Sequence, residues 1–156
     1  MGFWRLLACA GALALLGAGP PTGVALRTLE GDELEITRGA GGPDWVLHFW
    51  ASWCPDCIEE LPNLDLAAKG CDPSRVRVVA VNVGEDAELV RRFIAEHALR
   101  LPVLIDPHGK ASRKAGLWGL PSNLLWTAEG ERTSAGPSSA KRWRNRLAEL
   151  GCAEAP

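Results

Sequence analysis

The chain has 156 residues, which is enough for one ordinary domain and too few for two. Hydrophobic residues make up 47% of it and charged residues 23%, which excludes a disordered, collagen-like or coiled-coil chain. The 17 Lys and Arg residues against 19 Asp and Glu leave a net charge of −2, and the chain has no long basic run. No nucleic-acid partner is therefore expected. Five cysteines are too few for a small disulfide scaffold, so redox or metal chemistry has to be considered for them.

Residues 1–25 have the pattern of a secretion signal. Arg5 precedes an apolar run at 6–16, which Pro20 and Pro21 end. Such a run is typical of a signal peptide and is shorter than the roughly 20 residues of a membrane-spanning helix. Small residues before Ala25 predict cleavage after it, leaving residues 26–156 as one domain in the periplasm or another extracytoplasmic compartment. The alternative is that residues 1–25 stay as a membrane tether.

The rest of the chain alternates strand and helix patterns. Residues 24–29 and 34–37 predict a hairpin, and the apolar run 45–50 predicts a central strand buried on both faces. A helix is expected at 54–69, ended by Gly70. The elements expected after it are a strand at 76–83, a helix at 86–98, a strand at 102–105, a hairpin of 124–126 and 132–133, and a last helix carrying Trp143, Leu147 and Leu150. Parallel crossovers followed by an antiparallel hairpin give a mixed-sheet α/β domain.

Cys54-Pro55-Asp56-Cys57 lies where the central strand gives way to a helix. Unpaired N–H groups at the helix N-terminus favour a thiolate on Cys54, which would attack a partner disulfide, while the more buried Cys57 would resolve the mixed disulfide. A metal site would need a second ligand pair, which the lone Cys71 and Cys152 do not supply. No metal or other cofactor is expected.

The segment 50–57, Trp-Ala-Ser-Trp-Cys-Pro-Asp-Cys, followed by Pro62, resembles the active-site segment of the thioredoxin superfamily. The predicted N-terminal hairpin and the segments 59–62, 81–85 and 102–110 narrow the resemblance to the TlpA/ResA-like extracytoplasmic thiol–disulfide oxidoreductases. The match covers residues 24–150. It implies a thioredoxin-like fold, with a central mixed β-sheet flanked by helices and an N-terminal β-hairpin extension.

The resemblance assigns further residues to the site. Gly119-Leu120-Pro121 matches a loop that offers its backbone to the partner peptide, and Pro121 is expected in cis. The next two residues are usually Thr-Thr in the family but are Ser122-Asn123 here, which puts partner preference in doubt. Glu60 matches an acidic residue near the cysteine pair. Because Glu60 and Cys57 share a helix face, the carboxylate would relay protons to the thiol, the alternative being a solvated glutamate like Glu59.

His48 lies six residues before Cys54, where thioredoxins carry a buried acid and TlpA/ResA-like proteins often carry Asn. On a central strand its side chain would face the same layer as Val46 and Trp50. There it would accept the proton of Cys57 during resolution. The alternative is a neutral core histidine with one hydrogen bond, and buried polar groups generally behave in this way. His97 and His108 are expected at the surface.

The tryptophans divide into contact and packing residues. Trp53 is expected to contact partner proteins beside Pro55 and Asp56, and Trp50 to pack beneath it. The others are interpreted as packing residues because each follows an apolar stripe or a turn: Trp45, Trp118, Trp126 and Trp143.

In a thioredoxin-like fold, Cys71 and Cys152 would follow two helices on the same face of the sheet. A structural disulfide between them is therefore expected beside the redox pair Cys54–Cys57.

Negative charge on Asp56, Glu59 and Glu60 opposes the helix dipole that stabilises the Cys54 thiolate. A less stable thiolate makes the disulfide form relatively more stable, which predicts a reducing protein. The resemblance implies secreted or membrane-bound thiol/disulfide proteins as partners, including apocytochrome c or copper-site cysteines, and a membrane thiol carrier as electron donor. The alternatives are a disulfide-forming oxidase on the same fold and a redox-inert partner-binding module. A peroxidase is disfavoured because its reactive cysteine usually has a different sequence setting.

Overall fold

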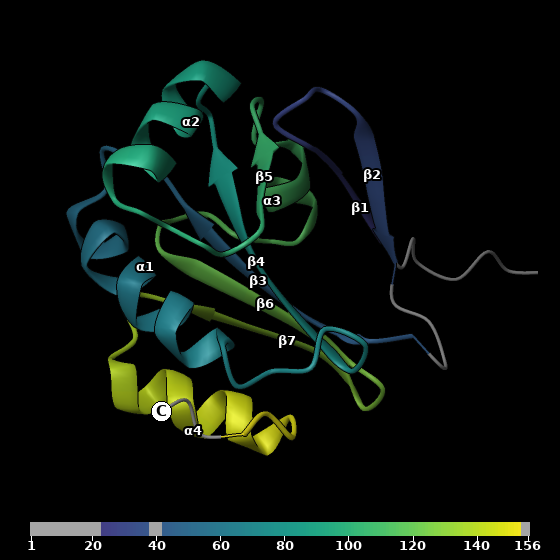
Figure 1. The fold of residues 1–156 in the computed structure, drawn as a ribbon. Helices are drawn as coiled ribbons and strands as arrows, with labels where there is room; N and C mark the ends of the chain where they lie inside the picture. The colour runs from purple at the N-terminus through teal and green to yellow at the C-terminus, as the bar shows by residue number, and fades with distance from the viewer. Residues whose placement is uncertain (1–22, 38–41, 154–156) are drawn as a thin grey trace, which may run out of the picture.

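The computed structural model describes residues 23–37 and 42–153, which form one seven-stranded sheet with helices on both faces (Figure 1). The strands are β1 (Gly23–Arg27), β2 (Glu33–Thr37), β3 (Asp44–Trp50), β4 (Val76–Val83), β5 (Val103–Asp106), β6 (Ser122–Thr127) and β7 (Gly130–Ala135). The helices are α1 (Pro55–Ala68), α2 (Ala87–Glu96), α3 (Lys110–Lys114) and α4 (Ala140–Glu149). The predicted mixed sheet, flanking helices and N-terminal hairpin are confirmed.

The sheet has the order β2-β1-β5-β4-β3-β6-β7. β3 lies at its centre, parallel to β4 and antiparallel to β6, while β4 and β5 are also parallel. The crossovers through α1 and α2 connect these parallel strands, as βαβ units require. The β1–β2 hairpin joins the sheet at its far edge through β5.

Alternation along β3 divides the interior into two cores. Val46 and Trp50 face one core, which also contains Cys57, Leu61 and Leu64 of α1. Leu47 and Phe49 face the other core, beneath the hairpin and α3. Residues from α1, α2 and α4 fill the first core, and Figure 1 shows these three helices on one side of the sheet. The site therefore lies over the α1–α4 face.

Helix boundaries follow local capping. Asp86 caps α2 by accepting the Leu89 N–H, and Ser139 caps α4 by accepting the Arg142 N–H. The five-residue α3 was not predicted, because one helical turn has no readable period. Its start is held by Asp106, whose carboxylate accepts from the backbone N–H groups of two α3 residues.

Cys71 and Cys152 form a disulfide that ties the end of α1 to the end of α4, with the two Cα atoms 4.3 Å apart. The Ala153 N–H donates to the Gly70 carbonyl at 2.8 Å beside it. A Cβ on Gly70 would lie 1.9 Å from the Ala153 carbonyl oxygen, so this approach of two backbones requires glycine. The pairing expected for these two cysteines is present in the structure.

The predicted signal lies mostly at residues 1–22, outside the described residues. The predicted cut after Ala25 falls inside β1, where Val24 and Leu26 are both buried in the core. Cleavage there would remove Val24 from its packing. Among the described residues, no helix combines the length and apolarity needed to cross a bilayer.

Candidate redox active site

Two cysteines at the start of α1 form a disulfide, with Cα atoms 5.2 Å apart. Cys54 is the N-cap of α1, and its Sγ accepts the Cys57 backbone N–H at 3.2 Å. Cys54 is 5% exposed and Cys57 is fully buried, in the order of accessibility predicted for an attacking and a resolving thiol. After reduction, the free N–H groups at this helix end would stabilise a thiolate on Cys54.

The turn before Cys54 is held by Glu85, which follows β4 and which sequence reasoning did not single out. The Glu85 carboxylate accepts the Ser52 backbone N–H at 2.8 Å, the Ser52 hydroxyl and the side-chain amide of Asn82. The Cys54 N–H closes the turn on the Ala51 carbonyl at 3.2 Å. Glu85 lies within the segment 81–85 that carries the family resemblance, but nothing in its local sequence indicates a contact 33 residues away.

The loop from Gly119 to Pro121 contains the expected cis peptide bond, between Leu120 and Pro121. The Ser122 hydroxyl donates to the Gly119 carbonyl at 2.6 Å, and the Gly136 N–H donates to the Pro121 carbonyl at 2.9 Å. Leu120 packs against the core that contains both active-site cysteines. The loop is therefore fixed at both ends beside the disulfide.

Two tryptophans are exposed, one next to Cys54 and one in the segment that leads into the Leu120–Pro121 loop. Trp53 is 68% exposed, as expected of a contact residue, whereas Trp118 is 82% exposed, so its interpretation as a packing residue is wrong. Trp118 lies in the loop between α3 and β6, where the adjacent Leu117 takes the buried position and Gly119 follows. Beneath the site, Trp50 is fully buried and its ring lies 4.8 Å from that of Phe93.

Of the other predicted site residues, Pro55, Asp56 and Glu59 are exposed on the first turns of α1, and His97 and His108 are also exposed. Glu60 is the exception among the α1 carboxylates. It is 2% exposed and points into the core, so its alternative interpretation as a solvated glutamate is wrong.

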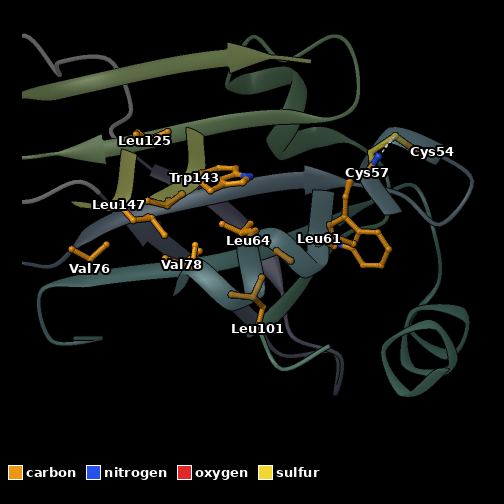
Figure 2. Packing of buried hydrophobic residues seen from close by; sticks show 14 of the residues in the cluster. Cys54, Cys57, Leu61, Leu64, Val76, Val78, Leu101, Leu125, Trp143 and Leu147 are labelled. Carbon is orange, nitrogen blue, oxygen red and sulfur yellow. Dashed lines mark hydrogen bonds between the residues drawn. A yellow bond between two sulfur atoms is a disulfide. The ribbon is translucent and has the colours of Figure 1, made fainter. Parts of the chain in front are cut away.

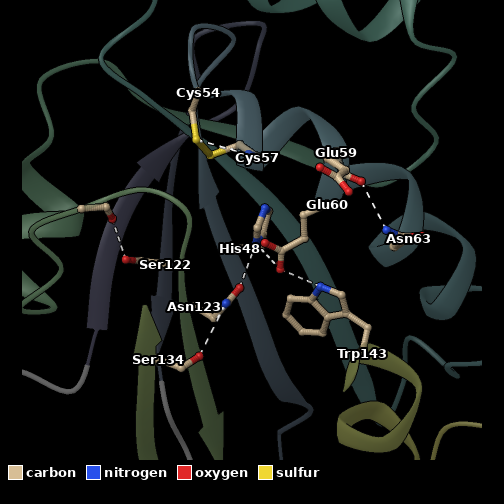
Figure 3. Close-up of polar contacts among 11 residues, drawn as sticks. His48, Cys54, Cys57, Glu59, Glu60, Asn63, Ser122, Asn123, Ser134 and Trp143 are labelled. Carbon is tan, nitrogen blue, oxygen red and sulfur yellow. Dashed lines mark hydrogen bonds and ion pairs between the residues drawn. A yellow bond between two sulfur atoms is a disulfide. The ribbon is translucent and has the colours of Figure 1, made fainter. Parts of the chain in front are cut away.

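A buried polar network lies below the disulfide (Figure 3). His48 Nδ1 lies 2.8 Å from Asn123 Oδ1 and 3.8 Å from Glu60 Oε1. The Trp143 indole N–H, from α4, donates to Glu60 Oε1 at 2.7 Å. His48 and Asn123 are directly opposite one another on β3 and β6. Two of the three positions at which this chain departs from the family pattern, His48 and Asn123, therefore pair with each other.

Burial acts oppositely on the two ionisable groups of the network. It lowers the pKa of His48 to about 4, against the hydrogen bond with Asn123, so His48 is neutral near pH 7. Burial also raises the pKa of Glu60, although the Ser138 and Trp143 N–H groups and the nearby arginines of α4 oppose the shift. A neutral His48 donates its Nδ1–H to Asn123. Its Nε2 and Glu60 Oε2 then have no hydrogen-bond partner among the described residues.

These pKa directions separate the two predicted proton carriers. A general base is most effective when its pKa lies near the working pH. The raised pKa brings Glu60 towards that range, and the lowered pKa takes His48 away from it. The geometry of His48 matches the neutral core histidine with one hydrogen bond, which was the alternative to a catalytic base.

A redox disulfide at a helix N-terminus, with a cis-proline loop beside it, defines a thiol–disulfide oxidoreductase of the thioredoxin fold. The AhpC/TSA family model matches residues 22–133, and this chain belongs to that family. Its resemblance to the ResA-like oxidoreductases is confirmed by the relatives that follow.

Sporulation thiol-disulfide oxidoreductase A of Bacillus subtilis is 29% identical over 127 residues, covering 78% of this chain and 76% of that protein. Thiol-disulfide oxidoreductase ResA of Halalkalibacterium halodurans is 31% identical over 106 residues, covering 68% of this chain. The chain spans 60% of the length of that ResA protein. The crystal structure of StoA from Bacillus subtilis matches with a TM-score of 0.66 and 30% identity, over 84% of this chain and 97% of that one.

Proposed function

We propose that this protein is an extracytoplasmic reductant that donates two electrons from Cys54 and Cys57 to disulfides in specific partner proteins. The Cys54 thiolate attacks one sulfur of the partner disulfide, forms a mixed disulfide and releases the other partner sulfur as a thiolate. Cys57 then loses its proton and attacks Cys54 Sγ, which releases the second partner thiol and leaves Cys54–Cys57 oxidised. The position of Cys54 as the more exposed N-cap of α1 carries this assignment.

Glu60 is proposed as the group that takes the Cys57 proton. It lies three residues along α1 from Cys57, is buried with it in one core, and has a raised pKa. His48 is proposed to support Glu60 as a neutral neighbour. The rival proposal, that His48 is itself the base, predicts that His48→Asn alters the pH dependence of thiol exchange.

The partner is proposed to lie across the exposed surface around the disulfide. Trp53, Pro55 and Asp56 form one side of this surface, and the Leu120–Pro121 loop forms the other. Trp118 extends the loop side with a second exposed indole. Exposed tryptophans suit a protein partner, because large aromatic side chains dominate the energetics of interfaces.

The direction of electron flow is proposed from charge. Asp56 and Glu59 place negative charge on the first turns of α1, which destabilises the thiolate form and favours the disulfide. Glu60 contributes less than expected, because its raised pKa reduces its negative charge. By resemblance to the family, the partners are apocytochrome c or copper-site cysteines, and a membrane thiol carrier supplies the electrons. Residues ahead of β1 are proposed to act as a secretion signal or membrane tether.

A trapping experiment tests this proposal. Cys57→Ser should accumulate a mixed disulfide between Cys54 and a substrate such as insulin, whereas Cys54→Ser should accumulate none. The wild-type chain should also reduce insulin with a thiol donor present. Failure of insulin reduction together with failure to trap would leave a redox-inert binding module as the better description.

A further inference from the structure

Helix α4 and the segments on either side of it are joined to the redox site and to α1 at three points. At its N-terminal side, the Gly136 N–H donates to the carbonyl of cis-Pro121. In its middle, the Trp143 indole N–H donates to Glu60, the buried carboxylate of α1. At its C-terminal side, the Cys71–Cys152 disulfide fastens it to the end of α1. The second disulfide is therefore part of the same α1–α4 contact that reaches Glu60.

Trp143 extends from α4 into the core between α1 and the sheet. Its ring is fully buried, meets the His48 ring edge-on at a centroid distance of 6.0 Å, and has the Arg146 guanidinium 5.2 Å from its centroid. Figure 2 shows Trp143 and Leu147 entering the core beside Leu61 and Leu64 of α1. A hydrogen bond of 2.7 Å weakens steeply as its distance and angle change. Small movements of α4 would therefore weaken the hydrogen bond that the Trp143 indole N–H donates to Glu60.

The apolar contacts of α4 are concentrated on one face, at Trp143 and Leu147. Of its ten residues only Trp143 and Leu147 are buried, and much of the remainder is charged and exposed. Cys152, by contrast, is buried in the same core, and the adjacent Ala153 N–H bonds to Gly70. At this end a covalent link and a backbone hydrogen bond therefore add to the apolar contacts that hold α4 against α1.

We propose that the Cys71–Cys152 disulfide is a positioning element of the redox site, which holds α4 so that Trp143 keeps its hydrogen bond to Glu60. Its consequence for catalysis rests on the proposed role of Glu60. The positional effect itself does not, because it is measurable on Glu60 in the oxidised protein without any thiol exchange.

The test is the pKa of the Glu60 carboxyl group, followed by carbon NMR in the oxidised full chain between about pH 4 and pH 9. Trp143→Phe keeps a buried ring and removes the donor, so the pKa of Glu60 should rise by about one. The double variant C71A/C152A should raise this pKa in the same direction by less. Adding C71A/C152A to Trp143→Phe should then produce no further rise, because the donor is already gone.

Two further variants keep the test decisive. Asn145→Ala changes an exposed, uncharged side chain of α4 and keeps the disulfide, and the Glu60 pKa should stay at its wild-type value. If C71A/C152A does not fold, Gly70→Ala displaces the Ala153 backbone from the same attachment and should also raise the pKa.

An unchanged Glu60 pKa in folded C71A/C152A would overturn the proposal and leave the disulfide a purely stabilising link. A rise that persists unchanged in the Trp143→Phe background would also overturn it, because the coupling would then bypass Trp143. Loss of insulin reduction with the pKa behaviour intact would instead count against the proposed function alone.

Discussion

Replacing His48 with Asn should make the protein less sensitive to acid. The free energy of unfolding should fall less between neutral pH and pH 4 in the variant than in the wild type. His48 is fully buried, and burial lowers its pKa from 6.5 to about 4. Between these two pH values the unfolded chain takes up a proton that the folded chain does not. Stability is therefore complete above about pH 6.5 and falls as the pH drops towards 4.

The size of this effect follows from the shift. A pKa shift of one unit corresponds to about 1.4 kcal/mol. The buried His48 therefore lowers the free energy of unfolding by about 3 kcal/mol when the pH has fallen to about 4. Glu60 acts in the opposite sense, because a carboxyl with a raised pKa loses stability as the pH rises above its ordinary value. That contribution is common to both proteins and largely cancels when wild type and variant are compared.

The assay is urea unfolding of the oxidised chain, without reductant, at about pH 7.5 and about pH 4. His48→Asn should lose about 3 kcal/mol less than wild type between the two conditions. His108→Asn, at an exposed histidine, should behave as wild type. Equal losses in wild type and His48→Asn would refute the assignment of His48 as a buried, neutral histidine.

Three further variants test other parts of the site. Glu85→Ala should lower the unfolding free energy by about 2 kcal/mol and slow insulin reduction, because the turn carrying Ser52 loses its acceptor, while Glu88→Ala at an exposed site of α2 should do neither. Trp118→Ala should raise the KM for a protein substrate about tenfold without moving the redox potential, and an unchanged KM would remove Trp118 from the partner surface. C71A/C152A should lose roughly 4 kcal/mol of stability in chemical denaturation, since the cross-link spans 81 residues, and a loss below about 1 kcal/mol would contradict the chain-entropy reasoning.

The sequence was informative where a residue's role depends on its neighbours in the chain. The Cys54–Cys57 pair, its helix and the strand 45–50 follow from local pattern, and β3 buries Val46 and Trp50 on one face as alternation requires. The cis peptide bond before Pro121 was predicted from the family resemblance, and so was the disulfide between Cys71 and Cys152. Neither could have been obtained from spacing alone.

The contacts that the sequence does not predict join distant segments. Glu85 reaches Ser52 across 33 positions, and Asn123 meets His48 across 75. No period or cap in a single sequence marks such pairs, because strand order and register create them. Trp118 was misplaced for a related reason: an aromatic residue in a loop is buried or exposed according to what the fold places over it.

The midpoint potential of the Cys54–Cys57 pair tests the proposed direction of electron flow most directly. It would be measured by equilibrating the oxidised chain with glutathione or dithiothreitol buffers, with C71A/C152A as a parallel sample to separate the two disulfides. A dedicated reductant should give a value below about −220 mV, towards the roughly −270 mV of thioredoxin. A value above about −160 mV would make the protein an oxidant and contradict the charge argument from Asp56 and Glu59.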